Sequence, residues 1–309
     1  MGLFIAEKEG PLEEVESFAA AVCGAELNTA VGLRRLGQDV SYMTKLGDDY
    51  WGRRIAAFAE KNGVSSEYIS LEETLHTGYM FKGKVSAGDP PIHYCRKGSA
   101  ASTLSERDID NIDFSEFDLV WVTGITPALS ESCLDACTYL QERANEAGCL
   151  FGFDPNLRLQ LWPDKEFMKE YLNDMAAGSD LFMPGINEGE ILMGSRNPEK
   201  IANYYLDRGT GMVIVKNGSN GAYYASKDGS SGNVPGFAVE KVVDTVGAGD
   251  GFAAGVISGF REGCRIYDSV RRGCAVGAIQ VMSKGDNDGL PTKAQMLAFM
   301  DGDPGWREK

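Results

Sequence analysis

Short apolar segments alternate with longer amphipathic stretches along most of this 309-residue chain, and this alternation constrains the fold more than any other feature. The apolar segments span residues 40–45, 117–124, 149–154, 180–183 and 212–216. Between two of them, Ser130–Ala147 has helical spacing, with Ser130 as a cap and Gly148 as a stop. Repeated strand–helix units predict an α/β fold with a mainly parallel sheet and helices on both faces.

Polar side chains follow several of these predicted strands. Asp154, Arg158, Asn187 and Lys216 each come shortly after an apolar segment. In parallel α/β sheets, ligands bind at the carboxyl ends of the strands. The sequence therefore places a candidate binding site at that edge of the sheet.

The residues Asp244–Asp250 read Asp-Thr-Val-Gly-Ala-Gly-Asp and lie between a predicted strand at 237–243 and a predicted helix at 252–260. A helix start after such a turn directs several backbone N–H groups and the positive end of the helix dipole at one point. A carboxylate there would repel a phosphate, which makes Asp250 chemically sensible as a base that takes a hydroxyl proton beside a phosphoryl group. Taken alone, the pattern fits an ordinary helix N-cap better.

Composition excludes several classes of protein. The formal net charge of −15 argues against nucleic acid or an anionic membrane as a partner. Seven cysteines without CxxC spacing suit a reducing cytoplasm, and two histidines make a histidine-rich metal site or a Ser-His-Asp triad a poor hypothesis. No stretch approaches the length of a membrane span. We expect a cytoplasmic protein with a large apolar core.

One region interrupts the strand–helix order. Residues 76–85 and 92–96 resemble two strands and are joined by the turn-rich segment Ser-Ala-Gly-Asp-Pro-Pro. The spacing predicts an antiparallel hairpin inserted into the α/β body. Such a hairpin is either a plain surface feature or a flap over a substrate pocket.

Together these residues resemble the ribokinase (phosphofructokinase-B) superfamily of sugar kinases. One superfamily signature matches Gly24–Asn28 and continues through Ala30–Gly37, and the more specific one matches Asp244–Asp250. The match runs from about residue 10 to residue 300 and includes no GxxxxGK[ST] P-loop. The resemblance implies one domain over residues 1–309. It also implies a three-layer ribokinase-like sandwich with a small β-hairpin lid built from about 3–20 and 74–100.

The resemblance also implies roles for residues at the phosphoryl-transfer site. Asp250 would be the catalytic base, and the turn would supply an anion hole from Gly247, Ala248 and Gly249. ATP would contact Asn187, Lys216, Gly218, Ser219 and Gly221. Mg²⁺ would lie near Glu190, which would act through water, because Asn187 and Glu190 match the family's N-x-x-E motif. Without the resemblance, the segment Asn187–Glu190 fits a capped helix start, and the segment Lys216–Gly221 fits a plain hairpin.

The substrate is inferred from the other half of the chain. The segment Arg96–Ser102 is similar to that of 2-keto-3-deoxygluconate kinases, which implies phosphorylation of this sugar acid at its C6 hydroxyl. Arg96 and Arg158 would hold the acid group, since guanidinium binds carboxylate through two parallel hydrogen bonds. The remaining substrate residues implied by the resemblance are Gly24, Asn28, Tyr94 and, near the transferred group, Asp286.

Three alternatives remain open. The segment 154–162 also resembles fructokinases, and a 5-dehydro-2-deoxygluconate kinase is a further enzyme reading. A different class is a catalytically inactive sugar-acid-binding protein on a kinase fold. The intact Gly247–Asp250 turn argues against that class. Lid hairpins in this family often pair across a dimer, so we expect a homo-oligomer.

The resemblance departs from the family at the N-terminus. Relatives have a strand ending in Gly-Glu before the segment that matches Met1–Ala6, and this strand has no counterpart here. Loss of one strand from a parallel sheet would expose backbone edges and cost several kcal/mol, against a typical total stability of roughly 5–15 kcal/mol. We expect the natural start to lie upstream of Met1.

Overall fold

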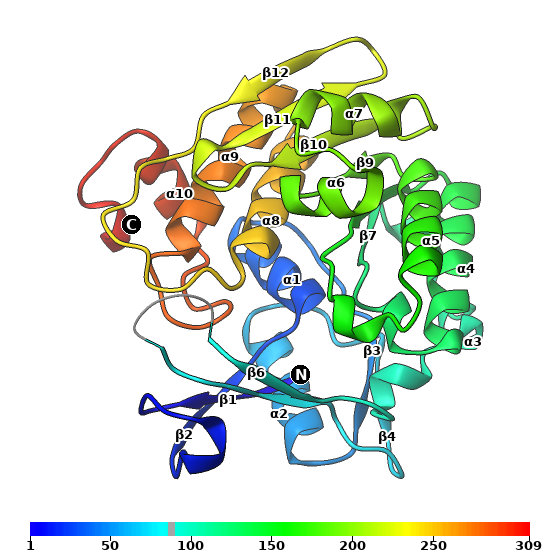
Figure 1. Cartoon of the computed structure of the whole chain (residues 1–309), viewed down its shortest axis with the longest axis vertical. Helices are drawn as coiled ribbons and strands as arrows, with labels where there is room; N and C mark the ends of the chain where they lie inside the picture. Colours follow the sequence, from blue (N-terminus) through cyan, green and yellow to red (C-terminus); the bar gives the residue numbers. More distant parts are fainter. Residues whose placement is uncertain (86–89) are drawn as a thin grey trace.

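The computed structural model describes residues 1–85 and 90–309. Its larger sheet has six strands (Figure 1). In spatial order they are β12 (Ser231–Val234), β11 (Ala222–Ser226), β10 (Met212–Lys216), β9 (Leu181–Phe182), β8 (Leu150–Asp154) and β7 (Leu119–Thr123). The strands from β7 to β10 run parallel, and β11 and β12 add an antiparallel edge. The prediction of a mainly parallel sheet is confirmed.

Helices cover both faces of this sheet (Figure 1). One face packs against α1 (Ala25–Arg35), α2 (Tyr50–Lys61), α8 (Ala248–Arg261), α9 (Ile266–Gln280) and α10 (Lys293–Met300). The other packs against α3 (Glu106–Ile109), α4 (Glu131–Ala147), α5 (Lys165–Ala177), α6 (Ile186–Met193) and α7 (Pro198–Leu206). Alternation along β10 explains this division, because Ile214 belongs to the first core cluster while Val213 and Val215 belong to the second.

A second sheet contains the segments predicted to form a lid, and we keep the name lid for this sheet. Its spatial order is β2 (Phe18–Val22), β1 (Gly2–Ala6), β5 (Tyr79–Lys82) and β6 (Ile92–Cys95). β5 and β6 are antiparallel, as predicted for the hairpin, and part of the turn between them lies outside the described residues. β1 joins the two halves because it pairs antiparallel with β2 and parallel with β5. The segments predicted for the lid therefore come together in one four-stranded sheet.

A break separates the large sheet from a small two-stranded sheet beside it. β3 (Thr44–Gly47) and β4 (Ile69–Glu72) form a parallel two-stranded sheet of their own, and within the described part of the chain β3 pairs with no other strand. β7 is the edge strand of the large sheet on the same side. We call the space between β3 and β7 the sheet gap. It is where a sheet continuous from β12 to β4 would need one more strand.

Two predicted strands need correction. Residues 237–243 form no strand but an irregular segment with a bend at Glu240, in which Val242 and Val243 are about half exposed. Alternating branched residues favour a strand only where a neighbouring strand pairs with them and one of their faces is buried. The strand predicted at 40–45 is displaced, because β3 begins only at Thr44. Within the described residues, no helix has the length and apolar character needed to cross a membrane.

Candidate active site

The glycine-rich turn leads directly into α8. Gly247 is the N-cap residue at a φ of +78°, and a Cβ there would lie 2.0 Å from the carbonyl oxygen of Asp286, so only glycine fits. The amides of Gly249 and Asp250 lie in the first helical turn, where no earlier helical carbonyl is available to them. A Cβ on Gly249 would meet nothing nearer than the Lys216 Nζ, 3.8 Å away. The turn therefore presents free amides to open space, as an anion hole requires.

Asp250 is the third residue of α8, and its carboxylate is held by two asparagines. Asn28 Nδ2 donates to one carboxylate oxygen at 2.8 Å, and Asn156 Nδ2 reaches the other at 3.5 Å. Burial raises the pKa of Asp250 to about 7, the Asn28 hydrogen bond works in the opposite direction, and the Asp154 carboxylate raises it further. A carboxylate poised near neutral pH suits a general base. The N-cap alternative is wrong, since Gly247 occupies that position.

A buried ion pair lies at the carboxyl ends of β8 and β10. The Lys216 Nζ contacts Asp154 Oδ2 at 2.5 Å, and Asp154 is only 2% exposed. The other oxygen of Asp154 accepts from the Asn156 amide at 3.0 Å. Although burial disfavours the charged form, the carboxylates of Asp154 and Glu188 hold the pKa of Lys216 above its usual value. Lys216 and Asp250 are thus joined through Asp154 and Asn156.

The lid reaches the same turn through Lys82. This lysine is buried, lies 2.5 Å from Asp244 Oδ2, and is 3.8 Å from Asp286 Oδ1. Asp244 in turn accepts from the Val246 amide at 3.1 Å. Burial raises the pKa of Asp286 to about 6, against the influence of Lys82. Strand β5 is therefore tied electrostatically to the start of the glycine-rich turn and to Asp286 beside it.

The predicted substrate arginines lie where β6 and β8 end. The Arg96 guanidinium stacks 4.1 Å above the Tyr94 ring, is 7% exposed, and has no hydrogen-bond partner for Nε or Nη2 among the described residues. Burial lowers the pKa of Arg96, and the nearby charge of Arg158 lowers it further. Arg158 donates to the Leu157 carbonyl at 3.0 Å. Two neighbouring cations therefore flank the predicted sugar position.

Gly24 and Asn28 are the other predicted sugar-binding residues. Gly24 caps α1 at a φ of +149°, and its carbonyl accepts from the Asn28 amide at 2.7 Å. The side-chain NH₂ of Asn28 donates to Asp250, and Asn28 Oδ1 accepts from Asn287 Nδ2 at 3.0 Å. In this structure Asn28 contacts the predicted base, and a sugar contact for it stays a prediction.

The predicted nucleotide residues follow β10 and begin α6. Gly218, Ser219 and Gly221 belong to a short turn after Lys216, in which a Cβ on Gly221 would lie 2.0 Å from the Val234 carbonyl oxygen. The backbone there approaches its neighbours as closely as glycine allows. Asn187 is exposed near the start of α6. Their contacts with ATP stay predictions.

The residues predicted to serve Mg²⁺ do not form a closed cage. Glu190 is exposed and forms an ion pair with Arg196 at 2.8 Å. Its neighbour Glu188 is committed to the backbone amides of Gly185 and Leu157, at 2.6 and 2.9 Å. The described residues contain no cluster of three potential metal-ligating side chains. Mg²⁺ usually keeps several waters and binds through one or two carboxylates plus substrate phosphates, and its contact with Glu190 through water stays a prediction.

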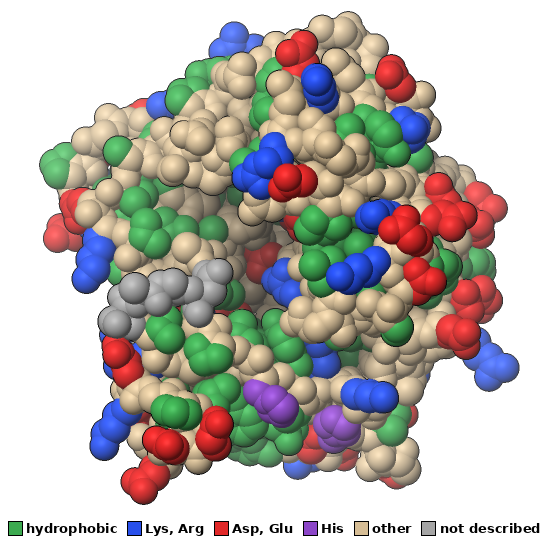
Figure 2. All heavy atoms as spheres, viewed as in Figure 1, with side chains coloured by type: hydrophobic (Ala, Val, Ile, Leu, Met, Phe, Trp, Pro, Cys, Tyr) green, Lys and Arg blue, Asp and Glu red, His purple; other side chains and the backbone are tan. Residues whose placement is uncertain are grey.

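The surface of the molecule is hollowed at this place. Figure 2 shows a depression near the centre of the face, with an acidic side chain at its floor and basic side chains beside it. Local cations matter here because the chain as a whole carries a formal charge of −15. Basic side chains beside this depression attract small anions locally, while the negative charge of the whole protein repels polyanions.

Sequence reasoning missed four residues of this site, namely Lys82, Asn156, Glu188 and Asn287. Lys82 had a signal: in β5 it shares the buried face with Met80 at a spacing of two residues. Asn156 had none, because its backbone φ of +35° and its contact with Asp250 are visible only in the fold. Glu188 and Glu190 lie two residues apart and so face different sides of the helix.

Phosphoryl transfer to a sugar is the chemistry that this fold and site define, and comparison with known proteins agrees. The sequence model of the pfkB family carbohydrate kinases matches residues 3–293. The chain therefore belongs to the pfkB family and is an ATP-dependent carbohydrate kinase.

Individual relatives support the same family. The chain is 45% identical over 302 residues to the 2-dehydro-3-deoxygluconokinase of Bacillus subtilis (strain 168), which covers 97% of this chain and 93% of the relative. It is 31% identical to the fructokinase-2 of Solanum lycopersicum over 94% of this chain and 90% of that one. The crystal structure of the PfkB protein from Polaromonas sp. JS666 superposes with a TM-score of 0.88 at 41% identity, covering 96% of each chain. The ribokinase-like fold is confirmed.

Proposed function

We propose that this kinase phosphorylates 2-keto-3-deoxygluconate (2-dehydro-3-deoxygluconate) at its C6 hydroxyl, giving 2-keto-3-deoxy-6-phosphogluconate. One observation carries the proposal: Arg96 is buried with Nε and Nη2 unpartnered among the described residues. These two nitrogens form one edge of the guanidinium plane, which is the edge that a carboxylate binds with two parallel hydrogen bonds. A neutral sugar offers this edge no charge.

Asp250 begins the reaction as the base. Its carboxylate accepts the C6 hydroxyl proton while the hydroxyl oxygen attacks the γ-phosphorus of ATP, whose β–γ bridging oxygen leaves with the electron pair of the broken bond. The amides of Gly247, Ala248 and Gly249 would face the developing negative charge, the Ala248 amide after giving up its 3.4 Å hydrogen bond to the Thr245 carbonyl. Asn28 and Asn156 keep the carboxylate of Asp250 in place during the transfer.

ATP and Mg²⁺ complete the site. Asn187, Lys216, Gly218, Ser219 and Gly221 would bind the nucleotide, and Glu190 would hold the metal through water after exchanging its contact with Arg196. When bound, Mg²⁺ neutralises charge on the β- and γ-phosphates. Lys216 would contact a phosphate of ATP, a role supported by its Nζ, which lies 3.8 Å from the position of a Cβ on Gly249.

A coupled ATP-consumption assay tests the substrate. We expect kcat/KM for 2-keto-3-deoxygluconate to exceed that for fructose and ribose by at least about a hundredfold, since a desolvated arginine left unpaired discriminates strongly. Preference for fructose would overturn the proposal and favour the alternative suggested by the fructokinase relatives. Sugar binding without ATP turnover would favour an inactive sugar-acid-binding protein. Including 5-dehydro-2-deoxygluconate separates the third alternative.

The lid also carries a candidate contact between two copies of the chain. The face of the lid opposite the buried Leu3 and Met80 carries an aromatic cluster of half-buried rings, formed by Phe4, Phe18, Tyr79 and Phe81 together with Trp51 of α2. Half-buried aromatic groups are enriched at interfaces. We place the homo-oligomer contact here, in a cytoplasmic protein whose seven cysteines are all free. Sedimentation should give an oligomer for the unaltered chain and a monomer for Phe81→Glu.

A further inference from the structure

A chain of buried hydrogen bonds connects the lid to Asp250. Asn287 Nδ2 donates to the carbonyl oxygen of Val22 and to Asn28 Oδ1, both at 3.0 Å. Asn28 Nδ2 in turn donates to Asp250 Oδ2 at 2.8 Å. The four residues come from β2, from the loop between α9 and α10, from α1 and from α8. We call this chain of contacts, from Val22 through Asn287 and Asn28 to Asp250, the amide relay.

The carbonyl group of Val22 fixes the orientation of both side-chain amides in the relay. A backbone carbonyl oxygen can only accept a hydrogen bond, so the atom of Asn287 that faces Val22 must be its NH₂ nitrogen. The same nitrogen lies 3.0 Å from Asn28, so the atom of Asn28 at this contact must be its oxygen. The remaining end of the Asn28 amide is its nitrogen, and this nitrogen faces Asp250.

Water does not reach the relay. Asn28 and Asn287 are 2% and 4% exposed, so water cannot replace a missing partner. The loop that carries Asn287 is held in place by Arg35, which donates to the carbonyl oxygens of Asn287 and Leu290 at 3.0 and 2.7 Å. A buried amide that loses its partner exchanges its two ends when this satisfies more hydrogen bonds. The orientation of Asn28 therefore depends on Asn287.

The orientation of Asn28 decides how Asp250 ionises. An N–H group that donates to a carboxylate favours the charged form, which is the form that can accept a proton. An amide oxygen in the same place repels the carboxylate and favours the protonated acid. Burial already raises the pKa of Asp250 to about 7, and the hydrogen bond from Asn28 opposes this rise. With Asn28 reversed, less of Asp250 would be ionised at neutral pH.

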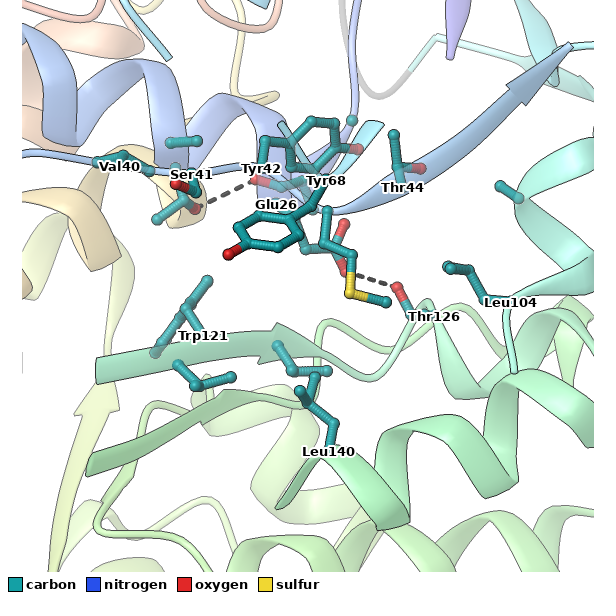
Figure 3. A pocket seen from close by; sticks show the side chains of 18 of the residues that line it. Glu26, Val40, Ser41, Tyr42, Thr44, Tyr68, Leu104, Trp121, Thr126 and Leu140 are labelled. Carbon is teal, nitrogen blue, oxygen red and sulfur yellow. Dashed lines mark hydrogen bonds between the residues drawn. The ribbon is translucent and has the colours of Figure 1, made fainter. Parts of the chain in front are cut away.

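The other charged groups that act on Asp250 come from several elements. The carboxylates that raise its pKa belong to Asp154 at the end of β8, Asp286 in the loop before α10, and Glu26 of α1. Lys216 at the end of β10 faces Asp250 as well, because the Asp250 charge raises the pKa of Lys216. Glu26 is paired with Thr126, whose hydroxyl donates to it at 2.9 Å (Figure 3). Within residues 1–85 and 90–309, none of these groups forms a hydrogen bond with the side chain of Asn287.

We propose that Asn287 is a positioning residue for phosphoryl transfer, which holds the side-chain amide of Asn28 so that Nδ2, and not Oδ1, faces Asp250. Asn287 acts through Asn28 and contacts no reacting atom. Its effect on the rate rests on the proposed role of Asp250 as the base, whereas its effect on the ionisation of Asp250 does not. Because Val22 ends β2, the relay also makes the orientation of Asn28 depend on a carbonyl group of the lid.

Infrared titration of the Asp250 carboxyl group tests the proposal without any reaction taking place. The carbonyl stretch of the protonated group is assigned by its absence in Asp250→Asn, and its intensity is followed against pH in the full chain. We expect Asn287→Leu to move the titration midpoint upward by about one pH unit, the size expected for one hydrogen bond to a charged group. Asn28→Ala should raise the midpoint as well. Adding Asn287→Leu to Asn28→Ala should raise it no further, because the two residues act as a unit.

Gln280→Met is the matched control. Gln280 is fully buried and donates to the carbonyl oxygens of Gly285 and Val246, at 2.8 and 3.3 Å. The variant therefore removes a buried amide that holds the same loop, but it leaves the contact between Asn287 and Asn28 in place. We expect it to lower the thermal unfolding temperature and to leave the titration midpoint unchanged.

The rate profile connects the relay to the reaction. With whichever sugar the chain phosphorylates fastest, kcat/KM of Asn287→Leu should be about fivefold below that of the unaltered chain at pH 7, because fewer molecules carry an ionised Asp250. The difference should vanish above about pH 9, where Asp250 is ionised in both proteins. A purely structural role of Asn287 would lower the rate equally at every pH.

Four results would overturn one claim or the other. An unchanged midpoint in Asn287→Leu would mean that Asn28 keeps its orientation without Asn287. An equal rise with and without Asn28 would mean that Asn287 does not act through it, and an equal rise in Gln280→Met would mean that general loosening is the cause. A midpoint that rises while the rate profile stays unchanged would support the role of Asn287 and refute Asp250 as the base.

A second variant covers the case in which Asn287→Leu does not fold. Asn287→Asp keeps the size of the side chain but replaces the donor by an acceptor, so it favours the reversed orientation of Asn28. Its added charge raises the midpoint directly in the presence and in the absence of Asn28, and this part cancels when the two backgrounds are compared. We expect a larger rise with Asn28 than in Asn28→Ala, and equal rises would contradict the proposal.

Discussion

At the carboxyl ends of β8 and β10, polar groups are densely paired: Asp154 binds both Lys216 and the Asn156 amide, and Asn28 and Asn156 hold Asp250. Along the sheet gap the situation is reversed. There the edges of β3 and β7 face a cavity, and the indole nitrogen of Trp121 has no partner among the described residues. The catalytic half is preorganised, whereas the strand edges beside the sheet gap carry no comparable network of paired side chains among the described residues.

The comparison shows how chemistry and stability are divided in this molecule. The base and the anion hole are built on β8, β10 and α8, all of which belong to the large sheet or pack against it. The sugar-acid end depends on the lid and on Arg96, which borders the sheet gap. A substitution that loosens the packing around the sheet gap should therefore affect substrate binding more than the chemical step.

The largest expected effect comes from Asp250→Asn. This change removes the base but keeps an oxygen that can accept from Asn28, so the fold is preserved. We expect kcat to fall about a thousandfold. ATP affinity, measured by calorimetry, should stay within about threefold of the unaltered protein. Near-normal turnover would remove Asp250 from the mechanism.

The second largest effect is expected from a substitution in the glycine-rich turn, and it concerns the stability of the protein. Gly247→Ala places a Cβ against the Asp286 carbonyl at a φ of +78°, and we expect it to lower the free energy of unfolding by about 3–5 kcal/mol. Gly148→Ala is the matched control, since Gly148 has a φ of +76° with nothing within 4 Å of the added atom. Its cost should be only about 1–2 kcal/mol. Similar losses in urea unfolding of the two variants would show that space at Gly247 is not what matters.

Lys82→Met tests the link between lid and turn. Removing this buried cation leaves Asp244 and Asp286 without it, and we expect a loss of about 3 kcal/mol at pH 8. The loss should shrink below about pH 6, where Asp286 takes up a proton. Lys84→Met changes an exposed lysine of the same segment, so thermal unfolding should barely respond. A pH-independent loss in Lys82→Met would argue for packing instead of charge.

The pH dependence gives the smallest effect. Because the pKa of Asp250 is about 7, kcat/KM should fall about tenfold per pH unit below pH 7 and level off above it. A raised carboxyl pKa means that the native state binds more protons than the unfolded chain between about pH 4 and 7, so stability falls as pH rises through this window. Asp250→Asn should flatten that fall.

Asn28→Ala sharpens the same measurement. Its hydrogen bond lowers the pKa of Asp250, so its loss should move the acidic limb of the rate profile to higher pH. A rate profile that reaches its plateau below pH 5 in the unaltered protein would contradict the assignment of Asp250 as a base with a raised pKa.

Much of the large sheet was predictable because local signals agreed with tertiary burial. β10 occupies the predicted residues 212–216, and α4 is capped by Ser130 and stopped by Gly148 in a left-handed conformation. The prediction failed at 237–243, where a strand-like pattern lies in an irregular segment that pairs with no strand. The alternation of residues in a segment predicts which side chains share a face. It does not predict whether a neighbouring strand is present to pair with that segment.

The candidate site was predictable only where a motif marked it. The glycine spacing at Gly247–Asp250 predicted a helix start with backbone N–H groups directed at one point. The role of Arg96 was inferred from a resemblance. The link from Lys82 to Asp244 spans 162 positions, and the contact between Asn156 and Asp250 spans 94. Contacts at such separations are created by topology, so no local pattern encodes them.

The central claim is that a densely paired catalytic half acts on a sugar acid chosen by Arg96. It is tested most directly by the ratio of kcat/KM for 2-keto-3-deoxygluconate to that for fructose, measured in the unaltered chain and in Arg96→Met. We predict a ratio of at least about a hundred that collapses toward one in the variant, through loss of activity on the keto acid alone. An unchanged ratio in Arg96→Met would contradict the account.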